Sequence, residues 1–127
     1  MKHLLSWRLI ALFGLILAVL PRVRAADPTK EDAAFSAELL GAIQNADYDA
    51  FVADGTPAFR GITKAQFDSV AGALGPKLKT AQVTYLGALS QRGYRVTLWK
   101  LAFADGSDDA LATLSVKAGK VGGYYIK

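Results

Sequence analysis

The side chains that could do chemistry in this sequence are mainly carboxylates, tyrosines and isolated basic residues. Three aspartates, Asp47, Asp49 and Asp54, lie close together in the chain. A general base needs a carboxylate inside a pocket that shifts its pKa. A calcium loop needs further ligands at set offsets, and this segment lacks them. The alternative is helix capping and surface charge, because aspartate is a preferred N-cap residue.

An aromatic pair, Tyr85 and Trp99, is the leading candidate for a binding pocket. Aromatic side chains at the centre of a concave sheet face can line an apolar ligand site. We expect Phe67 and Leu101 to share this lining, with Arg60 at the mouth, where a guanidinium could bind an anion through two hydrogen bonds. The alternatives are ordinary core packing for the pair and a solvated or carboxylate-paired arginine.

Several kinds of chemistry are excluded by residue types that the sequence lacks. There is no cysteine, and the one histidine, His3, lies in the N-terminal leader described next. Beyond the leader, disulfides, thiolate or imidazole metal sites and histidine-assisted nucleophiles are therefore excluded. We expect no metal and no cofactor, and any catalysis would have to use Asp, Tyr, Arg or Lys.

Residues 1–25 have the pattern of a secretory signal peptide. Lys2 and Arg8 give a basic start, residues 9–20 are apolar or small, and Val23-Arg24-Ala25 fits a cleavage site. An uncleaved anchor is the alternative, but twelve helical residues span about 18 Å, less than a hydrocarbon core of about 30 Å. We expect export to the periplasm or medium, no stable membrane anchor after processing, and one domain over residues 26–127.

The leader also accounts for the basic character of the chain. The formal net charge is +4, but four of the fifteen basic residues precede residue 26. The remaining chain carries equal numbers of basic and acidic residues. The sequence therefore gives no support for a nucleic-acid partner.

The strongest secondary-structure signal is the alternation in Tyr94–Phe103, which is typical of a strand with one covered face. We predict four strands, over residues 80–90, 94–104, 109–117 and 121–127. Short glycine-bearing turns between them favour antiparallel pairing. Three helices are predicted earlier, over residues 30–45, 48–53 and 64–74, with Gly75-Pro76 ending the last. The predicted fold class is α+β, with helices on one face of a curved four-stranded antiparallel sheet.

A register counted from the turns divides the strand residues between two faces. The face toward the helices is predicted to carry the bulkier set: Val83, Tyr85, Trp99, Leu101, Phe103, Leu114, Val116 and Val121. The outer face is predicted to carry Thr84, Leu86, Leu98, Lys100, Leu111, Thr113, Tyr124 and Ile126. Apolar groups on a face without helices suggest a partner surface. We expect a homodimer there through Leu86, Leu98, Leu111, Tyr124 and Ile126; scattered surface hydrophobes are the alternative.

Four segments carry a family resemblance: AIQNADYDAFVADG (42–55), ITKAQFDSVAGALGPKL (62–78), VTYLG (83–87) and YRVTLWKLAFADG (94–106). Helices followed by a strand meander over residues 29–127 resemble the nuclear-transport-factor-two-like superfamily, the SnoaL-like or cystatin-like fold, and its small exported bacterial members of unknown function. The resemblance implies a cone-like shape with a pocket between the helices and the concave sheet face. The superfamily hosts isomerases, dehydratases, binding modules and assembly domains, and this chain departs from its enzymes in having no histidine beyond the leader.

From the sequence we expect a non-enzymatic binding or interaction module. Its partner would be a small apolar or amphipathic ligand in a helix–sheet pocket around Trp99, or a second copy at the outer sheet face. Two alternatives stay open. One is an isomerase- or dehydratase-like enzyme that uses Asp, Tyr or Arg in the pocket. The other is a structural homo-oligomerisation domain whose interior is filled by side chains.

Overall fold

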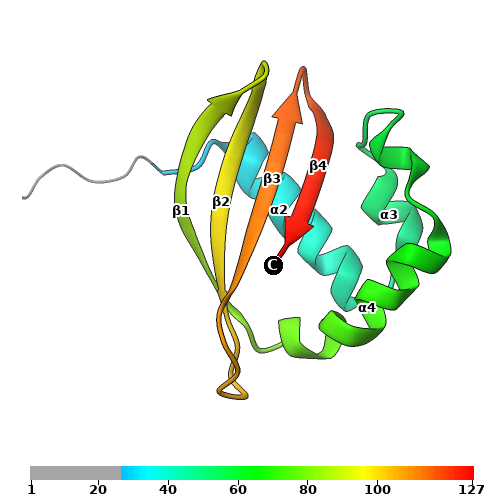
Figure 1. Ribbon diagram of the computed structural model, residues 1–127, viewed down its shortest axis with the longest axis vertical. Coiled ribbons are helices and arrows are strands. Elements are labelled where there is room, and N and C mark those ends of the chain that lie inside the picture. Colours follow the sequence, from blue (N-terminus) through cyan, green and yellow to red (C-terminus); the bar gives the residue numbers. More distant parts are fainter. Residues whose placement is uncertain (1–26) are drawn as a thin grey trace, which may run out of the picture.

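The computed structural model describes residues 27–127. The elements are α2 (Lys30–Gln44), α3 (Tyr48–Val52), η2 (Phe59–Gly61), α4 (Lys64–Leu78), β1 (Gln82–Gln91), β2 (Tyr94–Ala102), β3 (Ala110–Lys117) and β4 (Lys120–Ile126). The strands form one antiparallel sheet in the order β1-β2-β3-β4, and the helices lie on one side of it (Figure 1). The predicted α+β class is confirmed, whereas the predicted leader lies outside the described residues.

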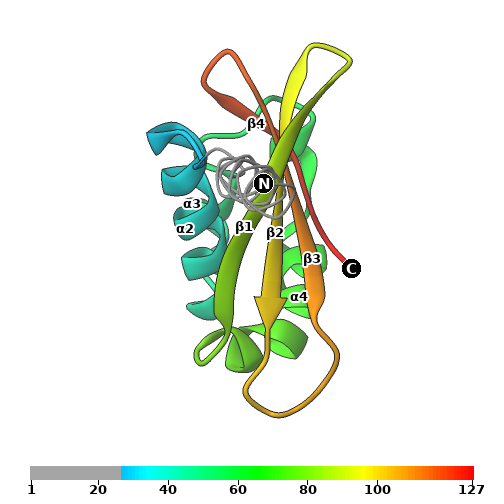
Figure 2. The same ribbon diagram turned by 90° about the vertical axis from the view of Figure 1, so that its left-hand side faces the viewer.

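Figure 2 presents the sheet with the helices beside and behind it. Helix α2 contacts the sheet at β3, and α3 and α4 pack against α2. Within residues 27–127, no helix combines the length and the hydropathy needed to cross a bilayer.

The helix starts follow from side-chain capping. Thr29 Oγ1 accepts a hydrogen bond from the Asp32 amide at 3.1 Å, and Asp47 accepts one from the Ala50 amide at 3.1 Å. Thr63 and Gln66 form a complete capping box at the start of α4. Each cap satisfies an N–H that has no partner within its helix. All three helix starts agree with the sequence prediction.

The end of α4 differs from the prediction. The helix continues through Gly75 and Pro76 to Leu78, although Gly-Pro usually ends a helix. Gly75 is buried, and a Cβ there would lie 3.0 Å from the Ile43 carbonyl of α2. Its role is therefore close helix–helix packing. Gln44 Nε2 donates to the Leu78 carbonyl at 3.0 Å and caps the extended end of α4.

The core lies between α2 and the centre of the sheet. Leu39 and Ile43 of α2 are buried against the inner face of β2 and β3, where Leu101 and Leu114 are fully buried. Burying a side chain of this size contributes about 1.5–3 kcal/mol. This contact fixes α2 on the sheet and provides the surface on which α4 packs.

Two β-bulges set the strand register. The first lies between Tyr85 and Gly87, and it leaves the predicted pairing of Tyr85 with Trp99 in place. The second lies in β4, where Val116 pairs with Val121 but Ser115 pairs with Gly123. An extra residue in one strand reverses the side-chain alternation beyond it, so the next residue, Tyr124, changes face.

The second bulge therefore corrects the predicted outer face. Tyr124 pairs with Leu114, and Ile126 pairs with Ala112, and both partners belong to the buried face of the sheet. Tyr124 and Ile126 accordingly face the helices and are not outer-face residues. Tyr125, which pairs with Thr113, takes the outer position and is 66% exposed.

Candidate functional site

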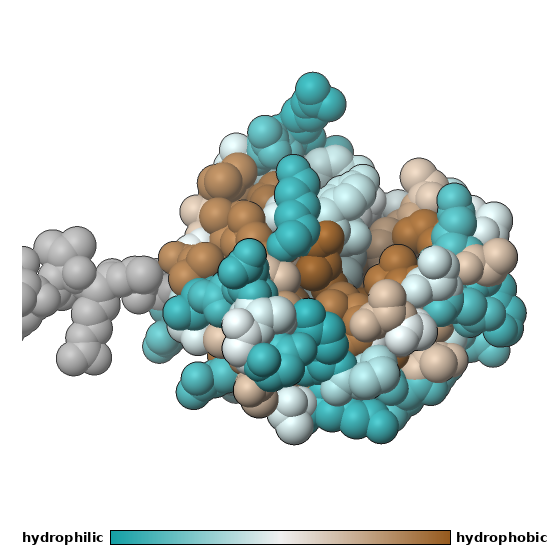
Figure 3. Space-filling view, turned by 60° about the horizontal axis from the view of Figure 1, so that its bottom comes forward, coloured by the Kyte–Doolittle hydropathy of each residue, from teal (hydrophilic) through white to brown (hydrophobic). Residues whose placement is uncertain are grey.

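An apolar pocket lies between α4 and the edge strand β4. Its volume is about 380 Å³, and Figure 3 shows hydrophobic surface in a hollow between the two layers. The lining comes from α2, α3, α4, the segment before α4, and β4: Ile43, Phe51, Ile62, Gln66, Phe67, Val70, Tyr124, Tyr125 and Ile126. A concave apolar lining with few polar groups is typical of small-molecule sites.

The pocket exists because α4 packs on α2 rather than on the sheet. Ala71 is buried in the core on one side of α4. The adjacent side of the same helix carries Gln66, Phe67 and Val70, at the spacing that places residues on one helix face. Val70 is 48% exposed at the pocket mouth. A wedge of space is thus left between this side of α4 and β4.

Aromatic rings form the floor of this wedge. Phe51 packs against Phe67 with ring centroids 5.0 Å apart, and against Phe59 at 5.2 Å. Tyr48 packs against Phe67 at 5.8 Å, and its hydroxyl donates a 2.5 Å hydrogen bond to the Ile62 carbonyl. This bond fixes the segment that carries Ile62 to the pocket rim. Interlocked rings of this kind give a rigid, pre-formed wall.

Tyr124 lines the pocket, and its hydroxyl is buried behind the pocket surface. Tyr124 is only 9% exposed and meets the Phe51 ring edge-on, with centroids 6.4 Å apart. No atom of residues 27–127 forms a hydrogen bond with its hydroxyl, which is buried. Burial raises the pKa of the Tyr124 phenol well above its usual value, so it stays protonated at neutral pH. An unpartnered buried hydroxyl costs about 1–3 kcal/mol, and a ligand whose entry shifts the surrounding side chains and reaches it could recover this cost.

Of the predicted pocket residues, only Phe67 lines this pocket. Trp99 and Leu101 are core residues, 6% and 0% exposed. The half-buried Tyr85 packs on Trp99, with ring centroids 5.0 Å apart, and lies near the opposite edge of the sheet. Arg60 is exposed and lines a separate, shallow hollow with Pro57 and Lys120. Neither hollow is lined by Trp99, Leu101 or Tyr85, so the pocket around Trp99 stays a prediction.

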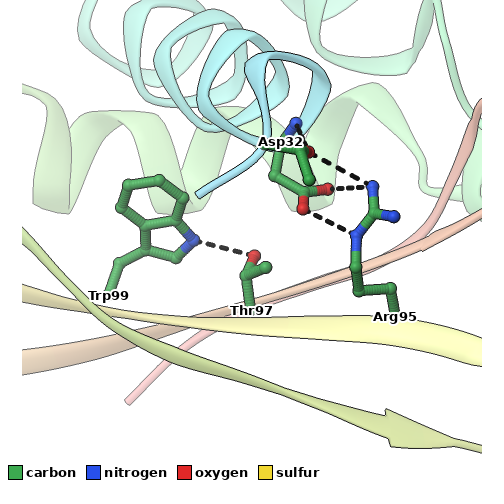
Figure 4. Close-up of polar contacts among 5 residues, drawn as sticks. Asp32, Arg95, Thr97 and Trp99 are labelled. Carbon is green, nitrogen blue, oxygen red and sulfur yellow. Dashed lines mark hydrogen bonds and ion pairs between the residues drawn. The ribbon is translucent and has the colours of Figure 1, made fainter. Parts of the chain in front are cut away.

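Polar groups near Trp99 are paired (Figure 4). Trp99 Nε1 donates to Thr97 Oγ1 at 2.9 Å. Asp32 in the first turn of α2 receives two hydrogen bonds from Arg95 of β2, from Nε at 2.7 Å and from Nη2 at 2.9 Å. The side chain of Asp32 is 1% exposed and that of Arg95 is 42% exposed. The Asp32–Arg95 pair anchors α2 to the sheet, whereas the Trp99–Thr97 bond lies within β2.

The outer face of the sheet carries part of the predicted interface. Leu86, in the first bulge, and Leu111 of β3 are exposed, whereas Leu98 of β2 is half-buried. Sequence reasoning missed Tyr125 on this face because the β4 bulge was not foreseen. Consecutive glycines, Gly122 and Gly123, could have indicated it, since glycine inside a strand often marks a bulge.

The three aspartates do not form a site. Asp47 caps α3, and the main-chain carbonyl of Asp54 accepts a 2.8 Å hydrogen bond from the Val121 amide. Glu38 of α2 lies beside Asp54; burial and then the Asp54 carboxyl raise the pKa of Glu38. Across residues 27–127, no three acidic, His or Cys side chains gather where they could hold a metal ion.

No family model matches the chain, and no curated protein shows significant similarity to it. The chain is similar in structure to an uncharacterized cystatin fold protein from Novosphingobium aromaticivorans. Sequence identity is 18% and the TM-score is 0.41, over 73% of this chain and 94% of that one.

Proposed function

We propose that the protein is a non-enzymatic binding module that holds a small, largely apolar ligand in the pocket between α4 and β4. The observation that carries this proposal is the buried, unpartnered hydroxyl of Tyr124 at a pocket of about 380 Å³. A ligand with an apolar body and one hydrogen-bonding group would bury its surface against Phe67 and Ile126. By shifting the side chains that cover that hydroxyl it would also satisfy it, and both contributions favour binding.

Catalysis is the weaker alternative for this pocket. Its lining contains no carboxylate, lysine or arginine. The Tyr124 phenol has a raised pKa, which makes it a poor general base at neutral pH. An isomerase or dehydratase needs a group that exchanges a proton with the substrate, and the lining supports hydrogen bonding instead.

A ligand pair tests the proposal. The probes are 4-phenyl-2-butanone, which has a carbonyl acceptor, and butylbenzene, a hydrocarbon of similar size. Binding is measured from amide chemical shifts of Phe67 and Ile126. We expect the ketone to bind more tightly than the hydrocarbon by about fivefold, as one hydrogen bond allows. Tyr124→Phe should abolish this preference while leaving hydrocarbon binding intact. An unchanged preference in the variant would contradict the proposed role of Tyr124.

Two variants on α4 test the location. Val70→Glu places a charge at the pocket mouth and should remove binding of both probes. Ala73→Glu is the matched control, because Ala73 is exposed on the same helix and does not line the pocket. Equal loss of binding in the two variants, or binding of neither probe to the unmodified protein, would overturn the proposal.

A homodimer through the outer sheet face is the second candidate. Exposed Leu86, Leu89, Leu111 and Tyr125 favour it. Tyr124 and Ile126, which were predicted to lie on this surface, face the helices and do not contribute to it. Light scattering should give twice the monomer mass, and Leu98→Glu should give a folded monomer. A monomer mass for the unmodified protein would remove this candidate.

We also propose membership of the nuclear-transport-factor-two-like superfamily and export by the predicted leader. The order of elements, with helices preceding a four-strand meander, supports the first. The basic start, the apolar run and Val23-Arg24-Ala25 support the second. The mass of protein recovered outside the cytoplasm tests export: cleavage after Ala25 predicts an N-terminus at Ala26.

A further inference from the structure

The free edge of β4 is the starting point. Leu111 and Lys127 exchange two main-chain hydrogen bonds of 3.0 Å. In an antiparallel pair, hydrogen-bonded and non-bonded positions alternate. Tyr125 and Gly123 are therefore the bonded positions, whereas the N–H and C=O groups of Tyr124 and Ile126 point away from β3. No loop or helix within residues 27–127 supplies a main-chain hydrogen bond to them.

The chain itself places a short strand on this edge. The Thr56 amide donates to the Val121 carbonyl at 2.8 Å, and the Val121 amide donates to the Asp54 carbonyl at 2.8 Å. Gly55 thus forms a single parallel bridge with Val121. Pro57 follows, and the chain turns into η2. The strand stops after one bridge, so the outward-facing groups of Tyr124 and Ile126 receive no hydrogen bond from it.

A groove continues along the uncovered part of the edge. A hollow of about 240 Å³ lies between η2 and β4, and it shares Ile62, Tyr124 and Tyr125 with the 380 Å³ pocket. The residues that line the two hollows carry no charged side chain. Main-chain donors and acceptors therefore run beside an apolar pocket, which is the combination used when a strand is added to a sheet edge.

Resting on the proposed binding function, we propose that the occupant of the pocket is an extended peptide segment. It adds to β4 as a parallel strand, with the same chain direction as the Gly55–Thr56 segment that already pairs with Val121. One of its apolar side chains enters the pocket beside Phe67 and Ile126. An extended main chain supplies alternating N–H and C=O groups for Tyr124 and Ile126, and its side chain supplies the apolar body. A peptide could thereby pair with the free main-chain groups of β4 and fill the apolar pocket at the same time.

The probes are capped pentapeptides with valine, leucine, phenylalanine or tyrosine at the third position and threonine elsewhere. Hydrogen exchange of individual amides is measured in the full domain, residues 26–127. We expect at least one peptide to slow exchange of the Tyr124 and Ile126 amides by tenfold or more. The Gly123 and Tyr125 amides are the internal control, because β3 already protects them and their rates should not change.

Alternate N-methylation separates strand addition from side-chain binding. Two versions of the best peptide are made, each methylated on every second amide. One version should bind at least tenfold more weakly and the other should bind as before, because only one set of amides faces β4. Equal affinity of the two versions would overturn strand addition.

The remaining outcomes are also distinct. If the ketone and hydrocarbon probes bind but no peptide protects Tyr124 and Ile126, this inference fails and the proposed function stands. If neither class of probe binds, both fail. Protection of these amides without peptide, together with a doubled mass in light scattering, would assign the edge to a second copy of the chain and overturn the peptide proposal.

Discussion

The β2 side and the β4 side of the helix–sheet interface differ in how their buried polar atoms are satisfied. At β2, Arg95 meets Asp32 and Trp99 meets Thr97. At β4, the Tyr124 hydroxyl has no partner among the described residues. The Asp32–Arg95 pair holds the two layers together, because separating them would leave a buried carboxylate without its partner. An unpaired group contributes no such attachment, and a ligand could pair with it if binding opened a path to the buried oxygen. The comparison therefore separates a structural region from the region where we propose binding.

The largest expected effect comes from breaking the Asp32–Arg95 pair. Arg95→Ala leaves the buried carboxylate of Asp32 without its partner, and we expect a loss of about 3 kcal/mol in the free energy of unfolding. Denaturant unfolding followed by circular dichroism measures it. Asp32→Ala should cost less, because the half-exposed Arg95 can be hydrated. Equal losses of unfolding free energy in the two variants would show that the burial of Asp32 does not set the cost of breaking the pair.

Thr97→Val should have the next largest effect. The substitution keeps the shape of the fully buried Thr97 but removes the acceptor for Trp99 Nε1. A buried donor left unsatisfied costs about 1–3 kcal/mol, measured in the same unfolding experiment. Thr113→Val, on the outer face, is the control and should change stability little. A neutral Thr97→Val would mean that Trp99 finds another partner.

Tyr124→Phe should have the opposite sign. The variant removes a hydroxyl that has no partner, so we expect stability without ligand to rise by up to about 1 kcal/mol. Tyr48→Phe is the matched control, since the Tyr48 hydroxyl is bonded to the Ile62 carbonyl and its removal should destabilise. Loss of stability in both variants would show that the two hydroxyls are equally satisfied.

The smallest effect concerns Glu38, whose pKa is raised by burial and by Asp54. The folded-state pKa of Glu38 lies above the ordinary value of 4.5. The contribution of the protonated Glu38 to stability is therefore fully present below pH 4.5. It is lost as pH rises through the folded-state pKa. Glu38→Gln should therefore stabilise the protein at pH 7 by a few tenths of a kcal/mol and have no effect at pH 3. In an Asp54→Asn background the gain should shrink, and an undiminished gain would contradict the pairing.

The sequence predicts most of the fold, because periodicity and capping are local signals. Thr63 and Gln66 start α4 as their types indicate, and the alternation around Trp99 gives a strand with a buried face. The end of α4 and the pocket beside β4 were not predicted, each for a non-local reason. Gly75 proved to be a packing residue, and α4 continues past Pro76 to Leu78. The β4 bulge moved the side chains of Tyr124 and Ile126 to the opposite face of the sheet. The position of this bulge depends on packing between strands rather than on local sequence.

The close contact at Gly75 also affects the dimensions of the hollow beside β4. A methyl group at this position would push against the Ile43 carbonyl, and α4 would have to tilt or slide on α2 to accommodate it. Because Phe67 and Val70 belong to the same rigid helix, such a tilt would change the aperture of the hollow without altering any residue that lines it. Gly75, which does not line the proposed pocket, thus influences the size of the ligand that the pocket could hold.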